Sequence, residues 1–131
     1  MAEHPNVELL RKGLDAFSRG DLDTVRSLWA DDIVHHFPGA SPIAGDHKGK
    51  DGVLAFVAKV AEMSQGTFRI SEVHDVLAND EHGVALLRFT ASRKGRELAW
   101  DQANVYHLRN GKMAEVWALL TDPWAVDEFF S

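Results

Sequence analysis

The sequence predicts an α+β fold in which three helices come first and an antiparallel sheet follows. Apolar residues recur at helical spacing in three segments between Asn6 and Gly66, and the period of the pattern changes to two residues after Gly66. The pair Asn110-Gly111 is a strong signal for a β-hairpin in this second part. A chain of 131 residues has room for one such unit, so we expect a single domain over residues 1–131.

Three helices are predicted in the first part of the chain, each with a recognisable boundary. The first covers about residues 6–19. The second begins after Asp21, whose side chain can cap it, and runs to about Ala30. The third begins after Gly49 and ends at Gly66, because glycine adopts the left-handed conformation that terminates helices.

Five strands and a short final helix complete the prediction. The first strand lies at about 33–37, and we expect the proline- and glycine-rich segment between it and Gly49 to form a loop. Lys94-Gly95 and Asn110-Gly111 are turn signals between later strands. Asp122-Pro123 is typical of the cap and first residue of a helix. The remaining predicted elements are strands at 67–77, 84–92, 97–108 and 112–121 and a helix at 124–130.

Composition excludes several classes of partner and chemistry. The chain has 14 Lys and Arg against 20 Asp and Glu, a formal net charge of −6. This charge repels phosphate backbones and anionic lipids, so we expect no nucleic-acid and no membrane partner. Cysteine is absent, which excludes disulfides and thiolate chemistry. The N-terminus has no signal-peptide pattern and no window is apolar enough to span a membrane, so we expect a cytoplasmic protein.

Both faces of the predicted strands carry apolar side chains. On one strand, Leu87 and Phe89 point to one face while Val84 and Leu86 point to the other. Three helices cover one face only, and a sheet in water normally leaves its second face polar. We therefore expect a homodimer through the convex sheet face, since an isologous dimer is the commonest way to cover such a surface.

A series of short motifs runs along nearly the whole chain: GDLD at 20–23, LWADD at 28–32, PG at 38–39, the segment 45–49, and NGKMAEVW at 110–117. In order and spacing these resemble the ketosteroid isomerase, SnoaL-like polyketide cyclase and nuclear transport factor 2-like superfamily. The resemblance implies a cone-shaped, curved antiparallel sheet wrapped around three N-terminal helices, with a short C-terminal helix, usually as a dimer. It also implies an apolar, ring-containing ligand in the cone, although the superfamily includes non-catalytic members.

The catalytic residues of these families mostly lack counterparts in this chain. The resemblance places the isomerase's tyrosine at Gly13, its general-base aspartate at Phe37 and its second oxyanion donor at Asn104. Glycine and phenylalanine cannot perform these roles, but an amide can still donate a hydrogen bond. Ala118 stands where SnoaL-like cyclases have an acid–base aspartate. The resemblance therefore implies a pocket with one donor and no steroid isomerisation.

A polar stripe interrupts the apolar pattern of the third strand of the predicted meander. Gln102, Asn104 and Tyr106 alternate along it and share a face, which the resemblance directs toward the cone. Two amides and a phenol on one face can hydrogen-bond a ligand carbonyl or hydroxyl. Alternatively, they form a polar ladder bonded to neighbouring strands.

Three of the seven histidines lie in the segment VHHFPGASPIAGDHKG, residues 34–49. His35 and His36 are adjacent on a strand, so at most one of them enters the cone, and His36 is opposite in parity to Phe37. His47 is the candidate proton carrier, since histidine titrates near neutral pH. The alternative is a turn-forming loop with solvated histidines. The spacing of the three matches no metal-ligand pattern, and we expect neither a metal nor a cofactor.

These observations favour a cone that binds a small apolar, ring-containing molecule. One hypothesis is a cofactor-independent isomerase, cyclase, lyase or hydrolase that works by proton transfer. The other is a non-catalytic ligand-binding or dimerisation module of the same fold. The candidate catalytic residues are His47 and Asn104. The candidate ligand-binding residues are His36, Phe37, Phe56, Val60, Gln102, Asn104, Tyr106 and Ala118.

Overall fold

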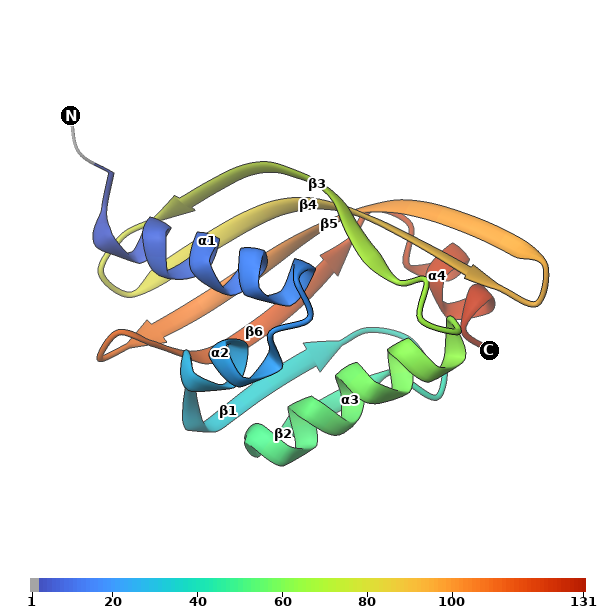
Figure 1. The fold of residues 1–131 in the computed structure, drawn as a ribbon, viewed down its shortest axis with the longest axis horizontal. Coiled ribbons are helices and arrows are strands. Elements are labelled where there is room, and N and C mark those ends of the chain that lie inside the picture. The colour runs from blue at the N-terminus through green and yellow to red at the C-terminus, as the bar shows by residue number, and fades with distance from the viewer. Residues whose placement is uncertain (1–2) are drawn as a thin grey trace.

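A six-stranded curved sheet forms the body of the protein in the computed structural model, which describes residues 3–131 (Figure 1). Met1 and Ala2, the start of the N-terminus in which no targeting sequence is expected, lie outside the described residues. The α+β fold class is confirmed. The elements are α1 (Pro5–Ser18), α2 (Leu22–Ser27), β1 (Trp29–Phe37), β2 (Gly45–Lys48), α3 (Gly49–Met63), β3 (Arg69–Ala78), β4 (His82–Arg93), β5 (Arg96–Arg109), β6 (Lys112–Leu120) and α4 (Pro123–Phe129).

The boundary residues behave as the sequence predicts. Asp21 caps α2 by accepting a hydrogen bond from the backbone N–H of Thr24. Asp122 caps α4 in the same way, through the backbone N–H of Ala125. Asn110-Gly111 turns with both φ angles positive, at 52° and 71°, which is the backbone of a tight hairpin.

The strand order is β2-β1-β6-β5-β4-β3. The strands from β3 to β6 form the predicted antiparallel meander. The pairing of β1 with β6 is parallel, which the sequence analysis did not predict. Register shifts interrupt the β1–β6, β3–β4 and β5–β6 pairings, and such irregularities bend strands and contribute to the curvature of the sheet.

Two boundaries in the first half differ from the prediction. The second helix ends at Ser27 rather than near Ala30, and Trp29 begins β1. The backbone N–H of Met113 donates to the carbonyl of Leu28. This segment therefore pairs with β6 and does not continue the helix. The segment expected to be a loop contains β2, which pairs antiparallel with β1.

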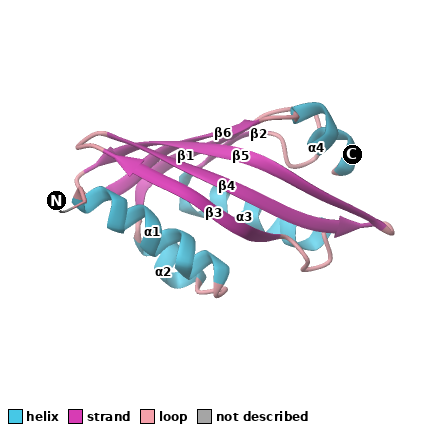
Figure 2. Cartoon of the chain, turned by 90° about the horizontal axis from the view of Figure 1, so that it is seen from above, coloured by secondary structure: helices cyan, strands magenta, loops and turns pink. Residues whose placement is uncertain are grey.

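The helices α1, α2 and α3 all lie on the concave side of the sheet (Figure 2). The side chains that are almost fully buried between helices and sheet include Leu10, Ile33 and Val53. At one end of the sheet, α4 places Phe130 edge-to-face against Trp100, with 6.2 Å between ring centroids. No helix of the described residues is long and apolar enough to cross a membrane.

The convex face has no helical cover within residues 3–131 (Figure 2). Its centre holds the half-buried side chains of Leu86, Val105 and Trp117 from three adjacent strands. Leu119 is 56% exposed and Leu77 is 51% exposed. The sequence-based expectation of apolar side chains on both faces is therefore confirmed.

His36 lies on this outer face and links three strands. Its Nδ1 lies 2.6 Å from a carboxylate oxygen of Asp46 on β2, and its Nε2 bonds to Glu115 on β6. Its ring stacks on Trp117, with 5.7 Å between centroids. Partial burial lowers the pKa of His36, but the hydrogen bonds and charges of the two carboxylates outweigh this and hold the pKa above its usual value of 6.5.

This cluster predicts a pH-dependent contribution to stability. Because the folded pKa of His36 is raised, its contribution is fully present below pH 6.5 and is lost as pH rises through the folded value. We expect His36→Gln to lower the free energy of unfolding at mildly acidic pH and to have less effect at alkaline pH. Urea denaturation of both proteins across this range measures the difference. His74→Gln, at an exposed position on β3, is the matched control. A constant difference at every pH contradicts the prediction.

Candidate functional site

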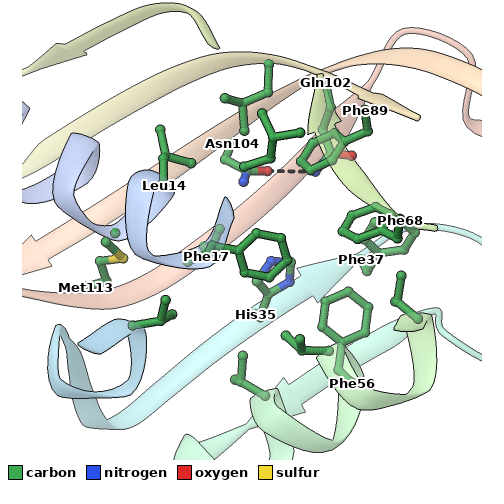
Figure 3. A pocket seen from close by; sticks show the side chains of 18 of the residues that line it. Leu14, Phe17, His35, Phe37, Phe56, Phe68, Phe89, Gln102, Asn104 and Met113 are labelled. Carbon is green, nitrogen blue, oxygen red and sulfur yellow. Dashed lines mark hydrogen bonds between the residues drawn. The ribbon is translucent and has the colours of Figure 1, made fainter. Parts of the chain in front are cut away.

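A cavity of about 130 Å³ lies between the concave face of the sheet and the helices (Figure 3). Its wall is mainly aromatic and aliphatic, and an apolar cavity of roughly 150 Å³ is large enough to hold benzene. The main polar side chains in the wall are His35, Gln102, Asn104 and Tyr106. The cavity therefore suits a ring-sized apolar molecule that meets a few fixed polar groups.

The polar groups on β5 form a hydrogen-bonded chain along the strand. Trp100 Nε1 donates to Gln102 Oε1 at 3.0 Å, and Gln102 Nε2 donates to Asn104 Oδ1 at 2.8 Å. Asn104 Nδ2 then donates to the phenol oxygen of Tyr106 at 3.4 Å. These residues share a face because they are two apart on a strand. The polar ladder that the sequence analysis gave as an alternative therefore exists. Its hydrogen bonds run along β5, however, and not to neighbouring strands.

This series of hydrogen bonds along β5 has a fixed direction. An indole N–H can only donate, so it determines which end of the Gln102 amide faces it, and that amide in turn orients Asn104. The phenol oxygen of Tyr106 accepts from Asn104, which leaves the phenol hydrogen to donate elsewhere. Burial raises the pKa of Tyr106 to about 12, although the hydrogen bond from Asn104 opposes the shift. The cavity thus holds neutral donors at this end.

His35 faces the same cavity from β1 (Figure 3). Its ring packs against Phe56, with 4.9 Å between centroids. Its Nδ1 is buried and has no hydrogen-bond partner within residues 3–131. Burial, followed by the neighbouring charges of His47 and His36, lowers the pKa of His35 to about 3. His35 is therefore neutral at physiological pH.

Most of the predicted ligand-binding residues lie in the cavity wall. Phe37, Phe56 and Val60 form part of its apolar side, and Gln102, Asn104 and Tyr106 form its polar stripe. Gly13, where the isomerase resemblance places a tyrosine, also lines the cavity. Their contact with a ligand remains a prediction.

Two predicted ligand-binding residues do not line the cavity. His36 points to the outer face, where Asp46 and Glu115 hold it, because alternation along β1 directs its neighbours inward. Ala118 is buried and pairs with Asn104 across β5 and β6, but its small side chain is outside the cavity wall. The sequence analysis missed His35, although its shared parity with Phe37 was the signal that could have identified it.

His47, the predicted proton carrier, also lies outside the cavity wall. It belongs to β2, where it pairs with His35 on the adjacent strand. Its Nε2 donates to the backbone carbonyl of Ile43 at 2.9 Å, and its ring stacks on Phe56 with 4.3 Å between centroids. These contacts give His47 a structural role and place Phe56 against both histidines.

The described residues of the cavity wall do not form a cluster of carboxylates and histidines. Among residues 3–131, no group of three or more histidines and carboxylates is arranged to hold a metal ion. His36 and His35 point to opposite faces of the sheet. The described residues lining the cavity include no Asp, Glu, Lys or Arg.

The burial of His35 predicts sensitivity to acid. The folded protein keeps this imidazole neutral down to about pH 3, whereas an unfolded chain binds the proton near pH 6.5. The unfolded state therefore binds more protons between these values, and stability falls as pH falls through this window. We expect His35→Phe to remove this component, on the order of a few kcal/mol. Denaturation at pH values from neutral to acidic compares the two proteins, and parallel pH profiles would contradict the prediction.

Comparison with known proteins places this architecture in a family. Across its full length the chain is 30% identical to the full-length uncharacterized protein Rv0034 of Mycobacterium tuberculosis H37Rv. The structure of Bal32a, from a soil-derived mobile gene cassette, matches with a TM-score of 0.91 and 33% identity over 96% of each chain. An NTF2-like protein from Burkholderia xenovorans LB400 matches with a TM-score of 0.84 and 24% identity, over 100% of this chain and 99% of its own.

These similarities agree with the resemblance drawn from the short motifs and with the observed sheet and helices. The SnoaL-like domain family matches residues 10–116, a span that runs from α1 into β6 and includes His35 and the polar chain of β5. The chain belongs to the SnoaL-like domain family.

Proposed function

We propose that the cavity binds a small, neutral, ring-containing molecule and that Asn104 and Tyr106 hold a polar group of this ligand. The observation that carries the proposal is an apolar cavity whose wall holds a pre-oriented row of neutral hydrogen-bond donors, Gln102, Asn104 and Tyr106. Buried amide and phenol groups retain hydrogen-bonding capacity beyond the bonds of the chain, and an oxygen atom of the ligand can use it.

Neutrality of the ligand follows from the electrostatics of the wall. Among the described residues that line the cavity, His35 and Tyr106 titrate, and both are neutral at physiological pH. A charged ligand loses its hydration on entry and meets no opposite charge. The free energy of desolvation therefore opposes its binding. An uncharged ring has no charge to desolvate, so this opposition is absent.

Binding is favoured over proton-transfer catalysis. An efficient general base has a pKa near the working pH, whereas the pKa of His35 is about 3. His47 is engaged by Ile43 and Phe56 outside the wall. Gly13 and Phe37, where the resemblance places the isomerase's tyrosine and its base, both line the cavity. We therefore favour the non-catalytic ligand-binding module over the cofactor-independent enzyme.

We also propose that a second copy of the chain covers the convex face. Apolar side chains occupy the middle of this face, and beside them Arg88 and Asp101 form an ion pair within one chain, at 2.9 Å. Two copies related by a two-fold axis bring together matching apolar strips. This arrangement leaves the concave cavity free for the ligand.

The proposed donor role of Asn104 predicts a selective loss of affinity. Leucine is nearly isosteric with asparagine but cannot donate or accept a hydrogen bond. We expect Asn104→Leu to weaken binding of a carbonyl-bearing ring such as acetophenone by about 1–3 kcal/mol, while binding of ethylbenzene changes little. Titration calorimetry with both probes measures this, and urea denaturation verifies that the variant is folded. Equal weakening for both probes would contradict a donor role.

The proposed dimer predicts a molecular mass of about twice 14.6 kDa at sedimentation equilibrium in the micromolar range. Leu119→Lys places a charge on the convex face and is expected to shift the protein to monomer. Leu22→Lys is the matched control, because Leu22 is also exposed but lies on α2. A monomeric native protein, or an equal response of both variants, would refute the proposed interface.

A further inference from the structure

His35 has a buried polar atom that the fold does not satisfy. Within residues 3–131, three buried side-chain polar atoms have no hydrogen-bond partner: His35 Nδ1, Ser41 Oγ and Thr90 Oγ1. Of these residues, His35 alone lines the cavity. Such an unsatisfied group destabilises the folded protein, and a ligand that supplies a hydrogen-bond partner removes this penalty.

His35 lies on the other side of the cavity from the polar chain of β5 (Figure 3). In the sheet, His35 of β1 pairs with Val116 of β6, which pairs with Tyr106 of β5. Two strand spacings separate the backbones of His35 and Tyr106, roughly 10 Å. The apolar side chain of Val116 lies between them. One polar substituent therefore cannot serve both sides, whereas two substituents with an apolar ring between them can.

The chemistry of the two sides defines the substituents. A neutral imidazole offers one N–H donor and one nitrogen acceptor, so a hydroxyl or a carbonyl oxygen satisfies it. At the other side, Asn104 and Tyr106 offer donors to an oxygen atom. Beside His35, Phe37 and Phe56 present aromatic surface to the cavity.

Resting on the proposed function, we propose that His35 is the second polar contact for the occupant of the cavity. The ligand class is then an uncharged ring compound with a hydroxyl or carbonyl oxygen at each of two opposite edges, such as a hydroxyphenyl ketone or a diphenol. His35 acts as a hydrogen-bonding residue, and Asn104 with Tyr106 holds the opposite oxygen.

The test compares probes that differ in their oxygens. The probes are 4-hydroxyacetophenone with two oxygens, acetophenone with one, and ethylbenzene with none. Titration calorimetry at neutral pH measures their affinities for the native protein and for His35→Phe, which keeps an aromatic ring. We expect the variant to lose roughly 5- to 150-fold in affinity for the two-oxygen probe and no more than about twofold for ethylbenzene.

A second variant separates polar recognition from packing. Phe56→Leu alters the wall beside His35 without changing a polar group, and we expect it to weaken the three probes to a similar extent. If His35→Phe behaves like Phe56→Leu, the polar role of His35 is wrong although the cavity still binds rings. If ethylbenzene and the other probes all fail to bind the native protein, the proposed function and this inference both fall.

Nitrogen-15 NMR of the imidazole rings gives a readout without any substitution. Hydrogen bonding to the ligand shifts the ring-nitrogen resonances of His35, whereas His36 and His47 already have partners in the protein. We expect 4-hydroxyacetophenone to shift the His35 resonances much more than ethylbenzene does. Equal shifts with both probes, or an unchanged His35, would overturn the proposal.

Discussion

The cavity depends on the parallel pairing of β1 with β6, two segments separated by most of the chain. This pairing brings His35 beside Val116 and, across β6, places both in line with Tyr106. It also holds the N-terminal helices over the concave face, because α2 leads directly into β1 and α3 follows β2, the partner of β1. Without it, the polar chain of β5 and the imidazole of His35 would not face the same space.

Two adjacent histidines show how strand alternation gives one residue type opposite properties. His35 is directed among aromatic side chains, where burial favours the neutral imidazole. His36 is directed to the outer face, where Asp46 and Glu115 favour the protonated form. The two shifts oppose each other across pH, because His35 disfavours folding in acid and His36 contributes less in alkali. The contacts of His36 with Asp46 on β2 and Glu115 on β6 thereby lie outside the cavity.

Local sequence signals predicted most of the fold. Periodicity located the helices and the antiparallel meander, and Asp21, Asp122 and Asn110-Gly111 marked boundaries that the structure confirms. The errors occurred where distant pairing decides local structure. The four-residue β2 has little pattern of its own and exists because β1 offers it an edge. Trp29 continued a helical stripe in the sequence, but pairing with β6 makes it a strand residue.

Within the site, the sequence predicted the polar stripe of β5 but not the role of Trp100, which precedes the stripe on the same strand. The indole of Trp100 determines the direction of every amide after it, so the donors that reach the cavity are set before any ligand enters. Pre-orientation of this kind reduces the entropy lost on binding. It also makes mismatches costly, because a ligand without an oxygen at this end leaves buried donors without an acceptor. Under the proposed function, neutral dipoles held in fixed directions would therefore select the ligand, without an ionised group in the cavity wall.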